Sequence, residues 1–166
     1  KPPLYIQINR VAEAPMIKTE HLFTMPVEVE MPLQMVGQTP IGERRIAKVT
    51  GGTFEGPKMK GTILPGGGDW LLLRSDGSLQ LDVRVTLQTD DDALIYMTYR
   101  GFRHGPAEVM ARLNKGEAVD PSEYYFRVAP FFETGAEKYD WLNRIVTVGT
   151  GHRLASGPVY EVFQVM

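Results

Sequence analysis

The chain has 166 residues, 43% of them hydrophobic, and a formal net charge of −2, which suits one globular domain. The absence of cysteine excludes disulfides, thiolate nucleophiles and cysteine metal ligands. The charge argues against nucleic-acid binding and against a basic membrane-binding patch. No apolar run is long enough to span a membrane, and the lack of disulfides favours a cytoplasmic location.

The sequence predicts an extended N-terminal arm over residues 1–19 and one domain over residues 20–166. Three prolines interrupt the first 15 residues, although Leu4, Ile6 and Ile8 alternate as in a short edge strand. Such an arm packs either on its own domain or on a neighbouring subunit. A homo-oligomer formed through the arm is therefore one expectation.

Most of the domain has strand-like patterns bounded by Gly and Pro turns. The first extended segment, residues 21–36, contains Pro26 and Pro32 and should be edge-like or bent, because proline lacks a backbone N–H. Further strands are predicted over residues 43–54, 58–64, 70–74, 78–89, 94–103, 124–133, 144–150 and 159–165.

Three short helical segments interrupt the strands. Residues 106–116 begin with proline and end with glycine, as helices often do. Residues 120–123 resemble a capping box, and residues 137–143 form a short helix with Tyr139 and Leu142 inward. Because strands and helices do not alternate regularly, the pattern favours a mainly β fold, a single antiparallel β-barrel with two or three short helices.

The clearest strand, residues 78–89, has one apolar and one polar face. Leucine and valine occupy alternate positions, and Asp82 and Arg84 share the polar face between them. Alternation alone leaves two interpretations open: the polar face is solvated, or it lines the lumen of the barrel.

The second interpretation gathers charged and phenolic groups from three strands. Tyr96 lies on residues 94–103, and Tyr125, Arg127 and Glu133 share one face of residues 124–133. In a lumen, Arg84 and Arg127 would hold a substrate oxygen anion, Asp82 or Glu133 would act as the base, and Tyr96 or Tyr125 would donate a proton.

Several further side chains are candidates for ligand contact. An apolar ligand wall could be formed by Trp70, Tyr99, Phe131, Phe132 and Trp141, although ordinary core packing is the commoner role of any one such residue. The three histidines are scattered without the spacing of metal ligands, so no metal site is predicted. His152, near a strand end, is the best functional candidate among them.

Six short stretches together resemble a family known as domain of unknown function 3237. The resemblance implies a small β-barrel of the lipocalin or allene-oxide-cyclase kind and draws attention to Asp69 and Asn143 besides residues already named. The family favours Asp-Gly where this chain has Asp91-Asp92. The matching stretches are residues 51–56 (Gly-Gly-Thr-Phe-Glu-Gly), 67–70 (Gly-Gly-Asp-Trp), 81–84 (Leu-Asp-Val-Arg), 124–127 (Tyr-Tyr-Phe-Arg), 132–135 (Phe-Glu-Thr-Gly) and 139–143 (Tyr-Asp-Trp-Leu-Asn).

Three classes of function remain open from the sequence. The favoured one is an acid/base enzyme of the isomerase, cyclase or hydratase/lyase type, working without a cofactor on a small, partly apolar or aromatic oxygenated metabolite. A non-catalytic carrier would use the same pocket for a small-molecule ligand. A structural or protein-interaction barrel is the third possibility, because fold alone does not fix function.

Overall fold

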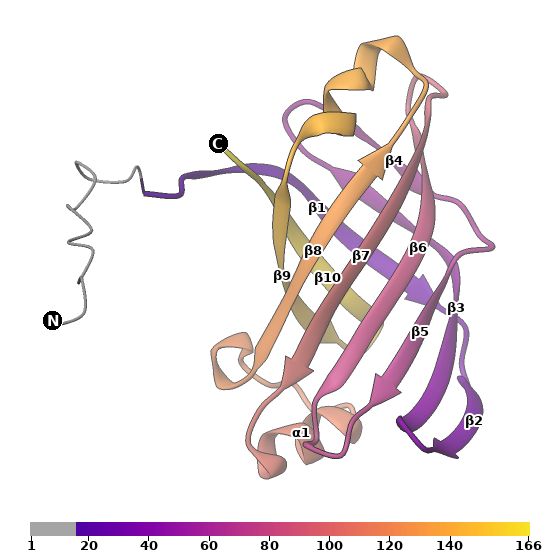
Figure 1. Cartoon of the computed structure of the whole chain (residues 1–166), viewed down its shortest axis with the longest axis vertical. Helices are drawn as coiled ribbons and strands as arrows, with labels where there is room; N and C mark the ends of the chain where they lie inside the picture. The colour runs from indigo at the N-terminus through magenta and orange to yellow at the C-terminus, as the bar shows by residue number, and fades with distance from the viewer. Residues whose placement is uncertain (1–15) are drawn as a thin grey trace, which may run out of the picture.

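The structure, a computed structural model, describes residues 16–166 and is dominated by antiparallel strands (Figure 1). The predicted mainly β fold is confirmed; Leu4, Ile6 and Ile8 of the predicted arm lie outside the described residues. The strands are β1 (Thr19–Val29), β2 (Gln34–Thr39), β3 (Gly42–Glu55), β4 (Lys60–Ile63), β5 (Gly68–Leu73), β6 (Leu79–Thr89), β7 (Leu94–His104), β8 (Tyr125–Glu133), β9 (Thr147–Leu154) and β10 (Gly157–Val165). The helices are α1 (Ala107–Asn114) and the 3₁₀ helices η1 (Pro121–Glu123) and η2 (Glu137–Arg144).

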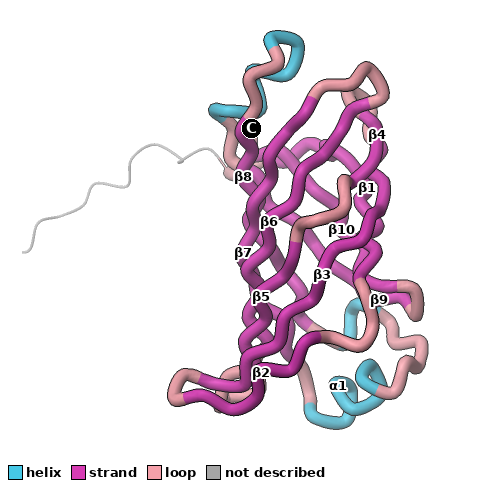
Figure 2. Tube along the Cα trace, turned by 90° about the vertical axis from the view of Figure 1, so that its right-hand side faces the viewer, coloured by secondary structure: helices cyan, strands magenta, loops and turns pink. Residues whose placement is uncertain are grey.

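The strands form a closed barrel with eight strand positions. β1 pairs with both β10 and β3, which closes the ring. β4 and β5 share one position between β3 and β6, each pairing with both neighbours. β2 pairs with β3 alone and extends from the ring at the end where α1 lies (Figure 2).

The extended segment predicted over residues 21–36 is two strands rather than one. β1 ends at Val29, and the connection through Met31 and Pro32 leads into β2. The break falls at a proline, which cannot donate to a strand ladder. β1 is not an edge strand, because it is paired on both sides; Pro26 itself lies opposite Val159 of β10.

The alternation of β6 fixes which face of the wall is inside. Every apolar residue from Leu79 to Leu87 is buried, whereas Asp82 is half-buried and Arg84 is exposed on the other side. The interior of an eight-stranded barrel is just wide enough for side chains to fill it. Burying five aliphatic side chains there is strongly favourable, so the polar face becomes the outer wall.

Short helices lie at both ends of the barrel (Figure 1). The helix predicted over residues 106–116 is α1, which buries Val109 and Leu113 and has Pro106 as its N-cap residue. At the opposite end η2 buries Tyr139 and Leu142, as predicted. No helix within residues 16–166 combines the length and the apolar character that a membrane crossing requires.

The turn between β6 and β7 contains a strained residue. Asp92 has a φ of 67°, in the left-handed region that glycine occupies most easily. The Thr89 side chain accepts a hydrogen bond from the backbone N–H of Ala93 and so closes the turn. This turn is the place where the chain departs from the Asp-Gly preference of the family it resembles.

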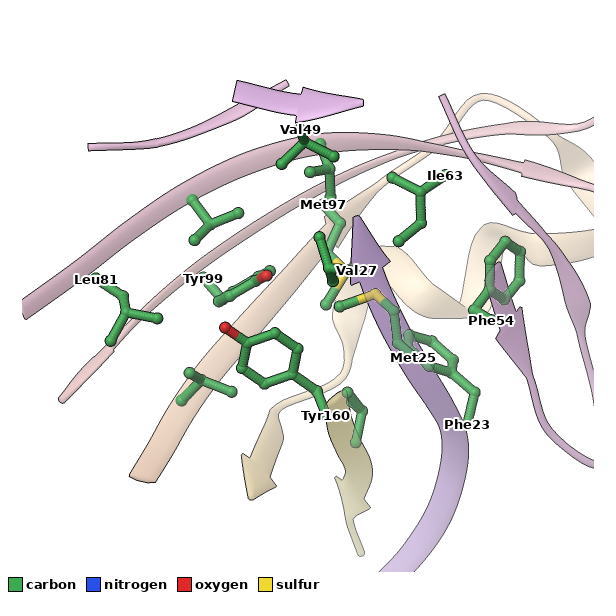
Figure 3. Close-up of a cluster of buried hydrophobic side chains, with 14 of the residues drawn as sticks. Phe23, Met25, Val27, Val49, Phe54, Ile63, Leu81, Met97, Tyr99 and Tyr160 are labelled. Atoms are coloured by element: carbon green, nitrogen blue, oxygen red, sulfur yellow. The ribbon is translucent and has the colours of Figure 1, made fainter. Parts of the chain in front are cut away.

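The barrel interior is filled unevenly along its axis. Toward the η2 end, the packed end, the Phe23 ring packs against Phe54 and Phe132, with ring centroids 5.5 and 6.0 Å apart, and all three side chains are buried. Figure 3 shows Phe23 and Phe54 beside Met25. Toward the α1 end the inward side chains leave a cavity. The packed end holds the barrel together, and the cavity end positions the candidate site.

Candidate active site in the barrel cavity

The cavity has a volume of about 80 Å³ and lies inside the α1 end of the barrel. Met31, which is 66% exposed, also lines it, so the cavity reaches solvent beside the β1–β2 connection. Most of its wall is aliphatic. The apolar lining comes from Val27, Val29, Leu33, Ala47, Val49, Leu71, Leu79, Leu81, Val83 and Phe126.

Asp69 is the one carboxylate that lines this cavity. It lies on β5 with its side chain inward, and its Oδ1 accepts a hydrogen bond from the backbone N–H of Asp82 at 3.0 Å. Burial raises the pKa of Asp69 to about 7, further helped by the charge of Asp82 and opposed by that hydrogen bond and by Arg103. A carboxyl group with this pKa can give up or take a proton near neutral pH.

Two buried tyrosines line the same cavity as Asp69. Tyr99 of β7 and Tyr160 of β10 pack edge to face with centroids 5.0 Å apart, and their hydroxyl groups point toward each other (Figure 3). Burial raises the pKa of both phenols, and the negative charge of Asp69 contributes to each rise. Both therefore stay protonated and serve as hydrogen-bond donors to an oxygen atom.

Two arginines stand at the end of the cavity. Arg103 is the second-last residue of β7 and Arg153 the second-last of β9, and both line the cavity. The Arg103 guanidinium lies 6.0 Å from the ring centroid of Phe126. Burial, and then the positive charge of Arg153, lower the pKa of Arg103, although an arginine remains charged in proteins.

This arrangement brings together a proton-transfer group, two fixed O–H donors and two cations in a mostly apolar site. Electrostatic interactions are stronger where water is excluded. The combination is suited to proton transfer on a small oxygenated molecule. Within residues 16–166, His, Cys, Asp and Glu side chains form no group of three or more with metal-binding geometry.

The charged residues predicted to line the lumen from β6 and β7 lie on the outer wall instead. Asp82 faces outward, 3.9 Å from the Nε atom of Arg100, and Arg84 lies over the Trp70 ring at 5.5 Å. Tyr96 is exposed on the same side. The expectation that these side chains share the lumen is wrong, because the apolar faces of both strands take the interior.

The predicted site residues of β8 are outside for the same reason. Tyr125, Arg127 and Glu133 alternate with the buried residues of that strand. Tyr125 stacks on His104 with centroids 4.8 Å apart, and the Arg127 guanidinium lies 5.2 Å from the Tyr125 ring centroid. The structure thus brings Tyr125 and Arg127 together, in a groove on the outer wall that Phe102 and Phe163 also line.

The remaining predicted contacts are separated from one another. Trp70 is exposed, and Trp141 lies on η2 at the packed end, with the Lys58 ammonium 5.4 Å from its ring centroid. The Asn143 side chain makes two hydrogen bonds to the backbone of Thr134, so it fixes a loop. His152 is half-buried on β9 and does not line the cavity. Of the predicted residues, only Asp69 and Tyr99 line it.

Three ionisable cavity residues were missed, Arg103, Arg153 and Tyr160, and Tyr99 was predicted only as part of an apolar ligand wall. For Tyr99 and Arg103 a signal exists in the sequence. Tyr99 and Arg103 have the same parity as the apolar Ile95 and Met97 on β7, so they interrupt an apolar face rather than belong to a polar one. Polar residues that interrupt an apolar face are the ones that a barrel turns inward.

The fold and the cavity define a small, closed antiparallel β-barrel with an ionisable interior. Residues 17–165 match the model of the family described as protein of unknown function DUF3237, and the chain belongs to this family. The resemblance stated from the sequence is confirmed. The UPF0311 protein RPA1785 of Rhodopseudomonas palustris is 36% identical over 152 residues, covering 92% of this chain and 99% of that protein.

Solved structures support the barrel. The crystal structure of RPA1785 has a TM-score of 0.87 at 35% identity and covers 92% of this chain and 100% of its own. A beta-barrel like protein from Acinetobacter baumannii has a TM-score of 0.81 at 42% identity, with coverages of 93% and 99%.

One more distant relative carries a named activity. A protein named hydroalkoxylation enzyme phnH, from Penicillium herquei, is 29% identical over 135 residues, covering 81% of this chain and 74% of that protein. The crystal structure of an enzyme from the same fungus has a TM-score of 0.71 at 26% identity, with coverages of 94% and 100%.

Proposed function

We propose that this protein is an enzyme that binds a small, partly apolar oxygenated metabolite in the barrel cavity and transfers a proton through Asp69. The reaction class is addition or cyclisation across a carbon–carbon double bond, within the isomerase, cyclase or hydratase/lyase range. The scheme uses protein side chains alone. The observation that carries it is a buried carboxyl group with a pKa near neutrality, beside an arginine and two phenols.

In the proposed step, protonated Asp69 gives its proton to a carbon atom of the double bond. A hydroxyl oxygen of the substrate forms a bond to the other carbon, and its proton passes to the Asp69 carboxylate. The enzyme ends as it began, and an intramolecular reaction yields an isomer of the substrate. Tyr99 and Tyr160 donate hydrogen bonds to a substrate oxygen and so orient the hydroxyl group beside the double bond.

The named fungal relative supports this reaction class. Hydroalkoxylation is the addition of an alcohol O–H across a carbon–carbon multiple bond, which needs proton delivery to carbon and proton removal from oxygen. A single carboxyl group with a pKa near 7 is able to do both.

A carrier function is the second candidate, and the aliphatic lining of the cavity favours it. A carrier has no need of a carboxyl group whose pKa is raised by burial, since that group destabilises the folded protein. The two functions therefore differ in the role of Asp69, which transfers a proton in an enzyme and has no chemical role in a carrier.

Deuterium incorporation separates them. The protein would be incubated in deuterium oxide with a panel of small unsaturated alcohols and phenols, and carbon-bound deuterium in the products would be measured by mass spectrometry. Asp69→Asn should lower incorporation at least about a hundredfold. Asp140→Asn, the same change on η2 at the opposite end of the barrel, should leave it unchanged. Equal rates for Asp69→Asn and the parent protein would overturn the proposed mechanism.

A further inference from the structure

The two cavity arginines form no ion pair within the part of the chain that the structure describes. Ion pairs there involve Arg45, Arg74, Arg100, Arg112 and Arg144, but neither Arg103 nor Arg153. The Nε atom of Arg103 is buried and finds no hydrogen-bond partner within residues 16–166. A buried N–H donor of a charged group without a partner is costly, because its hydration is lost without replacement.

The surrounding charges do not offset these cations. Arg153 and Arg45 both act on Arg103 as like charges, and Arg45 is already paired with Glu43 at 2.8 Å. Asp69 is the one carboxylate lining the cavity, and with a pKa of about 7 it is only partly ionised near neutral pH. The cavity therefore holds excess positive charge in an apolar surround.

We propose that Arg103 and Arg153 form an anion site at the end of the cavity, which takes the carboxylate of a small acid with an apolar remainder. A guanidinium presents two parallel N–H donors that match the two oxygens of a carboxylate. The ligand's apolar part then lies against Leu81 and Val83, toward Tyr99 and Tyr160. This inference rests on the proposed function and names its substrate class, an unsaturated carboxylic acid that also carries a hydroxyl group.

The size of the cavity limits the ligand. An apolar cavity of about 150 Å³ holds benzene, and this one measures about 80 Å³. It accommodates a short chain or the reactive end of a longer molecule whose remainder extends past Met31 to solvent.

Matched neutral and charged probes test the anion site without turnover. Hexanoate and hexanamide differ in charge but hardly in shape, and their dissociation constants would be measured by NMR titration of the whole chain. The parent protein should bind hexanoate at least about tenfold more tightly than hexanamide, and added salt should weaken hexanoate binding alone. Equal affinities, or no binding of hexanoate, would overturn the anion site.

Variants then locate the charge. Arg103→Gln and Arg153→Gln should each weaken hexanoate binding about tenfold and leave hexanamide binding unchanged. Arg100→Gln is the matched control, since Arg100 lies on the same strand with a side chain that is 78% exposed on the outer wall. If Arg100→Gln weakens hexanoate as much as the cavity variants do, the site is not in the cavity.

The outcomes separate this inference from the proposed function. A protein that loses deuterium incorporation in Asp69→Asn but shows no preference for hexanoate has the proposed chemistry and no anion site. A protein that prefers hexanoate through Arg103 but is indifferent to Asp69→Asn has the anion site and not the proposed chemistry. Thermal unfolding of each variant confirms that it is folded before binding is measured.

Discussion

The two ends of the barrel interior share most of their strands but differ in which side chains those strands turn inward. At the packed end β6 and β7 contribute Leu87, Ile95 and Met97, all completely buried and apolar. At the cavity end the same two strands contribute Leu81, Tyr99 and Arg103 around an unfilled space.

The difference separates stability from chemistry within one barrel. Tight packing of apolar groups stabilises the fold at the η2 end. Unfilled volume, a buried carboxyl group and unpaired cations all lower stability at the α1 end, and buried ionisable groups of that kind are typical of active sites.

The strongest contrast lies between two leucines on one strand. Leu87→Ala at the packed end should lower the free energy of unfolding by about 3 to 5 kcal/mol, because the side chain is fully buried among close neighbours. Leu81→Ala should lower it by about 2 kcal/mol, since its side chain already borders the cavity. Urea denaturation of both variants makes the comparison; equal losses would mean that the two ends are packed alike.

The next largest effect is a pH-dependent stabilisation by Asp69→Asn. The folded-state pKa of Asp69 is raised from 3.8 to about 7, so the folded state binds this proton more tightly than the unfolded chain does. The contribution of Asp69 to the free energy of unfolding is therefore fully present below pH 3.8 and is lost as the pH rises toward 7. Because one pKa unit corresponds to about 1.4 kcal/mol, the parent should lose about 3 kcal/mol relative to Asp69→Asn between pH 5 and pH 8.

Unfolding curves at several pH values measure this difference. Asn keeps an oxygen that accepts the hydrogen bond from the backbone of Asp82, so the substitution changes mainly the charge. Asp140→Asn on η2, at the opposite end of the barrel, is the control for the substitution itself. A constant difference between the parent protein and Asp69→Asn over this pH range would contradict the burial of an ionisable Asp69.

A smaller effect is expected at Arg84, outside the barrel. Arg84→Ala should lower the free energy of unfolding by less than about 1 kcal/mol, because an exposed cation over the Trp70 ring contributes about that much at most. An arginine paired inside the lumen would instead be worth about 3 to 5 kcal/mol. Chemical denaturation of the variant measures this loss in the free energy of unfolding. A loss of about 3 to 5 kcal/mol would show that Arg84 faces the interior.

The smallest effect concerns the strained turn at the packed end. Asp92→Gly should raise the free energy of unfolding by about 0.5 to 1 kcal/mol, because glycine adopts the left-handed conformation without steric strain. Binding of hexanoate in the cavity should not change. A loss of stability would show that the Asp92 side chain makes a compensating contact.

The sequence predicts the strands and helices well because local patterns control them. The alternation of β6, the turns rich in glycine, and the proline at the start of α1 are local signals, and each leads to the element observed. The prediction of one extended segment over residues 21–36 was wrong, because the segment is divided into β1 and β2. Pro26 lies within a paired strand, whereas Pro32 lies in the connection between the two strands. Proline alone does not distinguish those two cases.

The candidate site is harder to predict because it depends on which face closes inward. Alternation separates Asp82 and Arg84 from the leucines of β6 but is the same for either orientation. The size of the barrel decides which face of β6 points inward, because eight strands enclose only enough space for closely packed apolar side chains. Asp69 was identified through a family resemblance, whereas Tyr160 and Arg153 come together with it only when β9 and β10 complete the ring.

The most direct test of the cavity as a reactive site is the pKa of Asp69 itself. The carboxyl carbon of Asp69 would be followed by ¹³C NMR through a pH titration, with Asp69→Asn identifying the signal. We predict a midpoint at a pH of about 7, caused by burial in the cavity. A midpoint near the ordinary value of 3.8 would show that the carboxyl group is solvated, and the account of a proton-transfer site inside the barrel would be contradicted.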